Sequence, residues 1–418
     1  MIRVALIKTQ YSTKILFKGR NSTLPSTNLY DAFKEGESRA KEWKEKIKGA
    51  RSLADAFEDN FVFLSPDTFV NTEAANRLSV RIGEVSKSEE IITIIGPQRS
   101  GKSTAVRQLA NELNEHQGKG YAQYVEYDSH FWSWWEETDF KSTKFFFFDN
   151  IYPIWANLTR KSYLDLLNRS DHPRVLIVNI INSTEHHWLR FSHKTSRVSI
   201  FGTEPFEFHF KRPSILEIEN IIKARAESLG KLSLFPAETL KTIGELSLGL
   251  PGLALWLVRS VIADFENQEN QQKIPSALVH KVAQFLGFVP ALKIILEHDL
   301  RSLYQEESGN RVWPVLQLLQ ESSGMDSTPL TQSLKESKGI TTSWKPLLEE
   351  MLLLTQQNDT IRRSELQERT GIKESSLTYQ CQNLIKEKII TYSKSGREVF
   401  YQLRTPVKEA LELALFNK

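Results

Sequence analysis

The chain has 418 residues, of which 40% are hydrophobic and 25% charged, with a formal net charge of +3. This length predicts two or three domains, and this balance of residues excludes a disordered or fibrous chain. No apolar run approaches the roughly 20 residues that span a bilayer, and Arg3 and Lys8 stand where a signal peptide has its apolar core, so we expect a cytoplasmic protein without a membrane partner. The single cysteine, Cys381, excludes an internal disulfide and a multi-cysteine zinc site.

The chain begins with a basic extension, residues 1–60. A strand pair is expected over about Arg3–Phe17 and a charged helix over about Asn28–Lys48. Met1–Arg51 contains twelve Lys or Arg against five Asp or Glu. This excess fits either a solvated helix face or a sequence-independent contact with nucleic-acid phosphates, and the sequence leaves both interpretations open.

Residues 61–212 alternate between short apolar strands and helices, which is typical of a parallel sheet covered by helices. Strands are expected at Ile91–Ile95, Tyr121–Tyr127, Lys144–Phe148, Val175–Ile181 and Phe206–Phe210, and helices at Lys102–Asn114, Trp132–Glu137 and Trp155–Leu167. Over residues 213–305 four amphipathic helices predict a helical lid, namely Ile215–Leu229, Ala237–Leu246, Leu253–Phe265 and Ile274–Leu286. Residues 306–343, rich in Ser, Gly and Thr, are predicted to link the lid to a compact domain at 344–418.

A phosphate-binding loop follows directly on the first of these strands. The segment Gly96–Ser103 fits the Walker A pattern of a glycine, four spacer residues, a second glycine, a lysine and a residue with a hydroxyl group. In this pattern backbone N–H groups face the phosphates, Lys102 reaches the β and γ phosphates, and the Ser103 hydroxyl binds magnesium. The sequence therefore predicts ATP and Mg²⁺ as cofactors. The residues expected to hold the nucleotide here are Gly96, Pro97, Gln98, Arg99, Ser100, Gly101, Lys102, Ser103 and Thr104.

A carboxylate is expected beside this loop, at the end of a second strand. Four consecutive phenylalanines, Phe145–Phe148, suit a strand buried on both faces, and Asp149 follows them, where it can hold magnesium through water. The next residue is Asn150, where a fast ATPase usually has the glutamate that activates water. An amide orients water but cannot take its proton, so we expect slow hydrolysis unless Glu136 or Glu137 substitutes.

A third strand and two arginines add further candidates. Asn182 follows Val175–Ile181 and is expected either to sense the γ-phosphate or to form an ordinary strand-end turn. Arg190 or Arg197 is either an arginine finger for a neighbouring subunit or an ordinary surface arginine. Together, the candidate catalytic residues are Lys102, Asp149, Asn150 and Asn182.

The order of these motifs over about Phe61–Phe288 resembles the AAA+ superfamily. The segment Phe208–Ile222 is similar to the core-to-lid junction of its initiator clade, which contains origin-recognition ATPases. This resemblance implies an oligomerising nucleotide switch that acts on DNA. Where the lid of that clade commonly has a sensor arginine, the chain has Gly249–Gly252, a Gly-Leu-Pro-Gly element that resembles the STAND signalling ATPases, whose proline contacts the nucleotide base region. Pro251 is therefore a candidate nucleotide contact, or simply the start of a helix.

The last domain is predicted to hold three helices and a hairpin. The second helix is expected to begin at a Ser364 cap and to end at Gly371, and the third to run over Glu374–Lys386 with Cys381 in the core. This order resembles a winged helix, in which the third helix enters the major groove and the hairpin contacts the backbone. A role in protein contacts alone is the alternative. The residues then expected to contact DNA are Ser375, Ser376, Thr378, Tyr379, Gln382, Lys394 and Arg397.

These features predict an α/β P-loop NTPase of AAA+ type, with a parallel-sheet core and a helical lid, followed by a winged-helix domain. The expected function is an ATP-dependent DNA-binding switch that assembles with copies of itself or with a protein partner, in replication or plasmid initiation, transposition control or regulation. One alternative is a STAND-like signalling or defence ATPase whose C-terminal domain binds protein. Another is a P-loop kinase of a small molecule, against which the long helical lid argues.

Overall fold

The structure is a computed structural model of the whole chain. It describes residues 5–9, 12–16, 53–58, 68–86, 91–126, 142–150, 176–192, 207–266, 272–295, 340–355 and 358–416. The expected helices at Asn28–Lys48, Trp132–Glu137 and Trp155–Leu167, and most of the expected linker, lie outside these residues. The chain divides into two compact units, residues 1–51 and 52–418. In the first unit, the predicted strand pair is present as β1 (Ala5–Thr9) and β2 (Ser12–Leu16), which are antiparallel.

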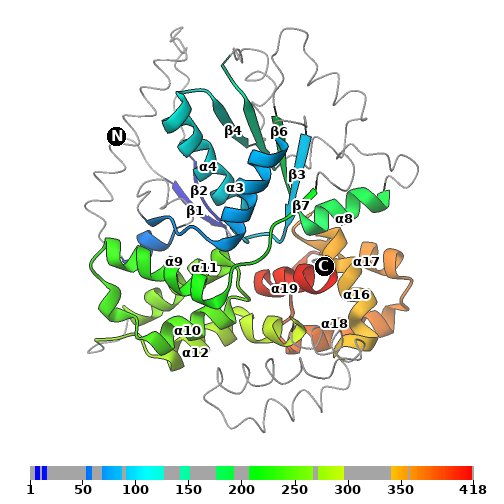
Figure 1. Ribbon diagram of the computed structural model, residues 1–418. Coiled ribbons are helices and arrows are strands. Elements are labelled where there is room, and N and C mark those ends of the chain that lie inside the picture. The colour runs from blue at the N-terminus through cyan, green and yellow to red at the C-terminus, as the bar shows by residue number, and fades with distance from the viewer. Residues whose placement is uncertain are drawn as a thin grey trace, which may run out of the picture. The chain divides into compact units, whose positions relative to one another are not determined.

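A five-stranded parallel sheet lies at the centre of the second unit (Figure 1). Each strand begins and ends within one residue of its predicted bounds, and the strongest signals are the runs Ile92–Ile95 and Phe145–Phe148, whose residues are all buried. The strand order is β4 (Ala122–Glu126), β5 (Phe145–Asp149), β6 (Leu176–Asn182), β3 (Ile91–Gly96) and β7 (Glu207–His209). The strand that precedes the phosphate loop, β3, lies between β6 and β7, so the winding direction of the sheet reverses there. Ligands of such sheets bind at this point, beyond the carboxyl ends of the strands.

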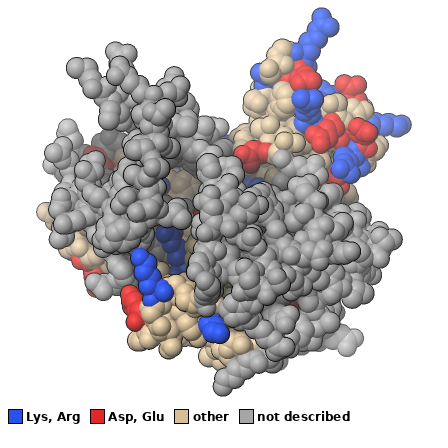
Figure 2. Space-filling model, turned by 90° about the horizontal axis from the view of Figure 1, so that it is seen from above, with Lys and Arg blue, Asp and Glu red and all other residues tan. Residues whose placement is uncertain are grey.

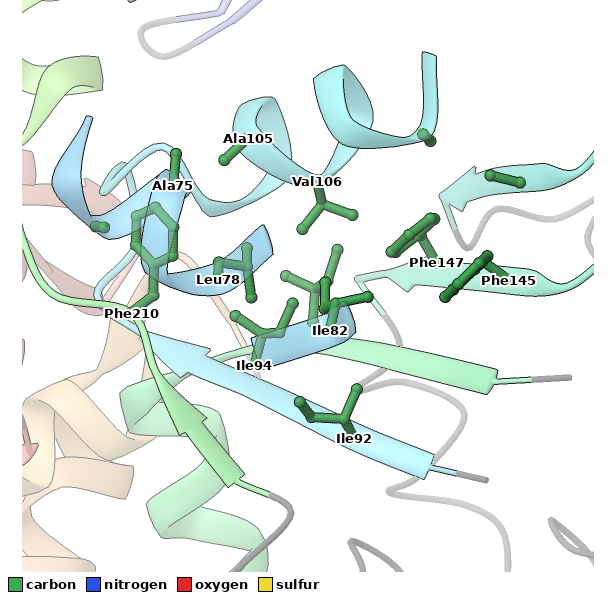
Figure 3. Packing of buried hydrophobic residues seen from close by; sticks show 14 of the residues in the cluster. Ala75, Leu78, Ile82, Ile92, Ile94, Ala105, Val106, Phe145, Phe147 and Phe210 are labelled. Atoms are coloured by element: carbon green, nitrogen blue, oxygen red, sulfur yellow. The ribbon is translucent and has the colours of Figure 1, made fainter. Parts of the chain in front are cut away.

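Two helices cover the sheet next to the P-loop strand and form its core (Figure 3). Ile94 of β3 packs with Val106 of α4 (Lys102–Gln117), and both side chains are fully buried. Leu78 belongs to α3 (Glu73–Val85), a helix that was not predicted from the sequence, and it packs into the same cluster. This packing fixes the start of α4 relative to the end of β3, and hence the loop between them.

Four helices form the lid, each within two residues of its predicted bounds: α9 (Ile215–Ser228), α10 (Ala237–Leu246), α11 (Pro251–Phe265) and α12 (Ser276–Leu286). A capping box between Ser214 and Glu217 fixes the start of α9. Among the described helices none is by itself both long and apolar enough to cross a bilayer. One pair, α12 with the helix over Phe288–Ile295, meets those conditions jointly but is bent by 84°.

Residues 340–416, termed the C-terminal region below, contain the predicted helices and hairpin. The elements are α16 (Ile340–Leu354), β8 (Ile361–Arg362), α17 (Arg363–Thr370), α18 (Glu374–Lys386), β9 (Ile390–Ser395), β10 (Glu398–Leu403) and α19 (Thr405–Phe416). The strands form an antiparallel sheet of order β8-β10-β9.

Two details of this region differ from expectation. The N-cap of α17 is Arg362, not Ser364, because the helix begins directly where β8 stops pairing with β10. The final helix, α19, was not predicted at all. The end of α17 at Gly371, in the left-handed conformation with φ of 66°, and the buried position of Cys381 on α18 agree with the sequence predictions.

Candidate functional site

The loop between β3 and α4 has the tight turn that a phosphate cradle needs. Arg99 and Gly101 have φ of 60° and 92°, in the left-handed region that glycine adopts most readily. A Cβ atom on Gly96 would lie 2.7 Å from the carbonyl oxygen of Phe210, so only glycine fits where β3 ends. Because α4 begins at Lys102, its first N–H groups and its dipole face the same space.

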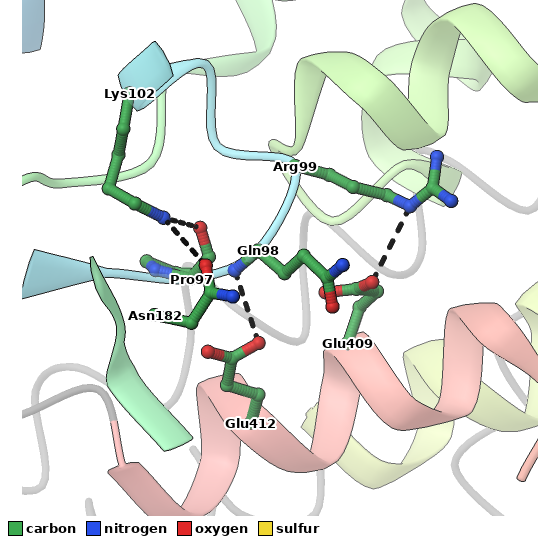
Figure 4. A network of polar contacts seen from close by, with 7 residues as sticks. All are labelled: Pro97, Gln98, Arg99, Lys102, Asn182, Glu409 and Glu412. Carbon is green, nitrogen blue, oxygen red and sulfur yellow. Dashed lines mark hydrogen bonds and ion pairs between the residues drawn. The ribbon is translucent and has the colours of Figure 1, made fainter. Parts of the chain in front are cut away.

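The side chain of Lys102 lies within this turn and is 5% exposed. Its Nζ donates to the carbonyl oxygen of Gly96 at 2.7 Å. It also donates to the carbonyl oxygen of Pro97, at 2.6 Å, and to Oδ1 of Asn182, at 3.2 Å (Figure 4). Burial lowers the pKa of the Lys102 amine, and neighbouring carboxylates oppose that shift, first Glu412 of α19. Lys102, the residue that the sequence assigns to phosphate binding, therefore connects the phosphate loop with the end of β6.

Asp149 at the end of β5 is held by hydrogen bonds to both of its carboxylate oxygens. The hydroxyl of Tyr124 on β4 donates to Oδ2 at 2.5 Å, and the N–H of Asn150 donates to Oδ1 at 2.9 Å. Burial and the adjacent Asp149 raise the pKa of Tyr124 well above its usual range, so this hydroxyl keeps its proton and acts as a donor. Arg107 of α4 stands over the Tyr124 ring, 5.7 Å from its centroid. Tyr124 is a site residue that sequence reasoning missed.

Asn182 is the last residue of β6 and immediately precedes α8 (Ser183–Ser192), which was not predicted. Its N–H donates to Oε2 of Glu185 at 3.0 Å, as in a capping box, while its side chain accepts from Lys102. Burial raises the pKa of Glu185. Arg197, Glu136 and Glu137, and the side chain of Arg190, lie outside the described part of the chain.

A cavity of about 310 Å³ connects these residues. Of the predicted residues in the loop, Gly96 and Pro97 do not line it, whereas the others do. Its walls also include residues that were not predicted, among them Phe69, Ile221 and Leu255. The predicted residues that line the cavity are Gln98, Arg99, Ser100, Gly101, Lys102, Ser103, Thr104, Asp149, Asn150, Asn182 and Pro251.

The lid touches the phosphate loop through the start of α11. Pro251 is the first residue of that helix, and its Cγ is 3.7 Å from where a Cβ on Gly101 would stand. The N–H of Gly252 donates to the carbonyl oxygen of Arg99 at 3.1 Å, and a Cβ on Gly252 would come within 2.9 Å of Arg99 Cβ. Pro251 therefore both begins a helix and lines the cavity.

The donors and acceptors of the cavity fit a magnesium-bound nucleotide. Lys102 supplies a cation, the start of α4 supplies N–H groups, and the buried Ser100 Oγ has no partner among the described residues. No group of three or more His, Cys, Asp or Glu side chains in the described ranges is placed to hold a metal ion alone. Magnesium at nucleotide sites usually needs only one or two protein oxygens besides phosphate oxygens and water, and Ser103 and Asp149 can provide them.

The residues predicted to contact DNA lie in the C-terminal region, on α18 and at the tip of the β9–β10 hairpin. Thr378 is half-buried: its Oγ1 accepts from Nη2 of Arg363 at 2.6 Å and donates to the carbonyl oxygen of Glu374 at 2.8 Å. The other six are exposed, and Tyr379 has 66% of its surface accessible. These are Ser375, Ser376, Tyr379, Gln382, Lys394 and Arg397.

The sheet order, the turn before α4 and the strand-end carboxylate define the class of fold, a P-loop ATPase fold with a helical lid. No protein-family model matches the chain, and no curated protein does. Among solved structures it is similar to the ORC1 protein of Aeropyrum pernix in complex with DNA, with a TM-score of 0.43 and 14% identity over 88% of this chain and 97% of that one. It is also similar to the ADP form of the ORC2 protein of Aeropyrum pernix, with a TM-score of 0.44 and 11% identity over 86% and 96%. It is similar as well to domain III of the Thermotoga maritima replication initiation protein DnaA, with a TM-score of 0.38 and 11% identity over 54% of this chain and 96% of that one. At these TM-scores the similarities carry no argument about function.

Proposed function

We propose that the chain is an AAA+-type ATPase that binds Mg-ATP and uses the bound nucleotide as a switch. One observation carries the proposal: Lys102, Ser103, Asp149 and Asn182, from three different strand ends, line a single cavity at the point where the sheet reverses its winding. A polyphosphate needs a cation, backbone donors and a magnesium ligand in one place, and these residues supply them. Bound Mg²⁺ would neutralise developing charge on the transferred phosphoryl group.

Hydrolysis should be slow, which suits a switch. Asn150 lines the cavity beside Asp149, and an amide cannot remove a proton from the attacking water. Two further acids, Glu126 and Glu185, line the cavity, and Glu185 already accepts the N–H of Asn182. The nucleotide-bound state would therefore persist long enough to act as a signal.

The C-terminal region supports DNA as the partner. Its order of helix, strand, two helices and hairpin resembles that of a winged helix, and α18 would then be the helix that enters the major groove. Six of the seven predicted contact residues are exposed, and two of them are the cations Lys394 and Arg397 at the hairpin tip. Figure 2 shows Lys and Arg interspersed with Asp and Glu over the described part of one face.

A STAND-like signalling ATPase is the second candidate, with Pro251 as the observation that favours it. This proline lines the cavity, where it could contact a nucleotide, and the resemblance implies a contact with the nucleotide base region for the proline of the Gly-Leu-Pro-Gly element. In that case the C-terminal region would bind a protein, and ATP would drive assembly with copies of the chain. The two candidates differ in whether duplex DNA is bound.

Two titrations test the proposal. Wild-type protein should bind a fluorescent ATP analogue with magnesium, and Lys102→Ala should lose tight binding while keeping the circular dichroism spectrum of a folded protein, since it removes the phosphate cation and its local hydrogen bonds but no part of the apolar core. Undiminished nucleotide affinity in Lys102→Ala would refute the assignment of the loop. Binding of labelled duplex DNA, with and without ATP, then separates the candidates: no DNA binding together with ATP-dependent assembly in analytical ultracentrifugation favours the signalling ATPase.

A further inference from the structure

Two glutamates of the last helix are buried. Glu409 and Glu412 of α19 are 1% and 3% exposed, and a spacing of three residues puts them on one face of the helix. Carboxylates are almost never buried this completely unless they are paired, because the loss of hydration destabilises the charged form. We therefore identify the groups that pair with these two side chains.

Both glutamates contact the phosphate loop (Figure 4). Glu412 accepts hydrogen bonds from the N–H of Gln98, at 3.1 Å, and from the N–H of Thr184, at 3.3 Å. Glu409 pairs with Arg99, with 3.5 Å between Oε1 and Nε. Gln98 and Arg99 are spacer residues of the loop, and Thr184 lies just after β6. Glu412 thus bridges the loop after β3 and the first turn of α8, from 314 and 228 positions away in the chain.

This contact places negative charge beside the cation of the loop. Burial lowers the pKa of Lys102, and Glu412 is the largest of the charges that oppose this shift. Burial and the adjacent Glu412 raise the pKa of Glu409 to about 8, which Arg99 only partly opposes. Within the described ranges Glu409 Oε2 has no hydrogen-bond partner. The docked α19 therefore keeps two acids at the edge of a site that would receive further negative charge from a polyphosphate.

We propose that α19 is an acidic latch on the phosphate loop, in which Glu412 and Glu409 hold the loop while the C-terminal region is docked and a bound nucleoside triphosphate displaces them. The proposal rests on the proposed function, because it requires a nucleotide at the loop. Two physical effects oppose simultaneous occupancy. The Gln98 N–H already donates to Glu412 and so is not available to a phosphate, and like charges in a partly dehydrated site repel strongly.

The latch makes the nucleotide and the C-terminal region communicate in both directions. If docking of α19 weakens triphosphate binding by some factor, triphosphate binding must weaken docking by the same factor. Glu412 is a positioning residue in this scheme, since it acts on phosphate through the backbone of the loop. Release of α19 would change how α18 and the hairpin are presented, without any contact between nucleotide and a partner of the C-terminal region.

The test measures triphosphate affinity in the full chain. Glu412→Gln keeps the size of the side chain and one accepting oxygen but removes the charge, and we expect it to tighten binding of a fluorescent ATP analogue with magnesium about fivefold or more, the lower end of typical coupling between sites. Glu409→Gln should act in the same direction when affinity is measured above pH 8, because the pKa of Glu409 is raised to about 8 and the carboxylate is charged only there, and it covers the case in which Glu412→Gln does not fold. Glu368→Gln makes the same change of charge on an exposed residue of α17 and should leave affinity unchanged.

A second measurement follows α19 itself. In wild-type protein, saturating Mg-ATP should increase hydrogen–deuterium exchange in peptides covering residues 405–416, and Lys102→Ala should abolish that increase. A purely structural role for Glu412 predicts no such nucleotide dependence. Equal or weaker affinity in both glutamine variants, or unchanged exchange in α19, overturns the latch while leaving the proposed function standing. Absence of nucleotide binding in wild type and in both glutamine variants overturns the proposed function, and the latch with it.

Discussion

At the scale of single residues, Asn150 governs the predicted rate of hydrolysis. It lines the cavity beside Asp149 in the left-handed conformation, with φ of 54°, which Asn tolerates better than most residues. Asn150→Glu should raise the single-turnover rate of ATP hydrolysis, by up to the roughly 10²-fold that a positioned general base contributes at the low end. Asn150→Ala should change that rate little. A wild-type rate typical of fast ATPases that collapses in Asn150→Ala would mean that the amide is itself catalytic.

Tyr124 is expected to act through Asp149. Its hydroxyl donates to Asp149 Oδ2 at 2.5 Å and so orients the carboxylate that is proposed to hold magnesium. Tyr124→Phe removes only that donor, and we expect the magnesium concentration for half-maximal nucleotide binding to rise about tenfold, as is typical when a partner of a metal ligand is lost. Nucleotide binding without magnesium should not change. Tyr121→Phe, on a ring that packs against Phe145, is the matched control. Identical magnesium dependence in wild type and Tyr124→Phe would contradict this role.

The residues of the site differ in how far sequence could identify them. Lys102 and Ser103 were predictable because a phosphate loop is encoded by a continuous pattern at fixed spacing. Asp149 was predictable because it ends an unmistakably buried strand. Tyr124 was not, because its role depends on the pairing of β4 with β5, which sets Glu126 opposite Asp149 and brings the Tyr124 hydroxyl to the carboxylate. Nothing in a single sequence specifies that register.

At the scale of elements, α18 and the β9–β10 hairpin should contribute to DNA binding in different ways. Arg397 at the exposed hairpin tip suits a phosphate contact, so Arg397→Ala should weaken binding to every duplex and reduce the salt-dependence slope by about one. Gln382 is exposed on α18, and Gln382→Ala should alter preference among sequences instead. Titrations of several duplexes over a range of salt concentrations separate the two effects. A uniform loss of affinity in both variants would contradict the assignment of α18 to the major groove.

The elements missed by sequence reasoning have two causes. The strands were found because continuous apolar runs announce them, but α3 and α8 are short amphipathic helices beside stronger signals, with mixed polar surfaces. α19 carried usable signals: Pro406 near its start and the apolar residues Val407, Ala410, Leu411 and Ala414 at helical spacing. The helix was nevertheless missed because Glu409 and Glu412 lie on its buried face, whereas the buried face of an amphipathic helix usually carries apolar residues.

At the scale of the whole molecule, the sequence places the phosphate loop and the C-terminal region in different domains, whereas the structure joins them through α19. Hydrogen bonds that connect Glu412 with Gln98 span 314 positions, and no local pattern encodes such a contact. Two additional contacts strengthen the junction: Arg404 donates to the carbonyl oxygen of Phe285 at 2.8 Å, and the rings of His187 and Phe416 stand 4.3 Å apart. The C-terminal region thus also contacts the lid and α8.

The pH dependence of stability should show how far the buried Glu409 lowers the free energy of unfolding. Burial and Glu412 raise the pKa of Glu409 to about 8, against opposing effects of Arg99, Lys408 and Lys102. An acid with a raised pKa contributes most to stability when protonated, so its contribution is complete below about pH 4.5, where the unfolded side chain titrates, and is lost as pH rises through 8. Glu409→Gln has no proton to lose. The melting temperature of the variant minus that of wild type should therefore increase between pH 5.5 and 8.5, by about 1 °C for each kcal/mol involved in a chain of this length. Glu368→Gln should show no such trend. A difference that stays constant or shrinks as pH rises would mean that Glu409 is ionised throughout and that Arg99 neutralises it fully.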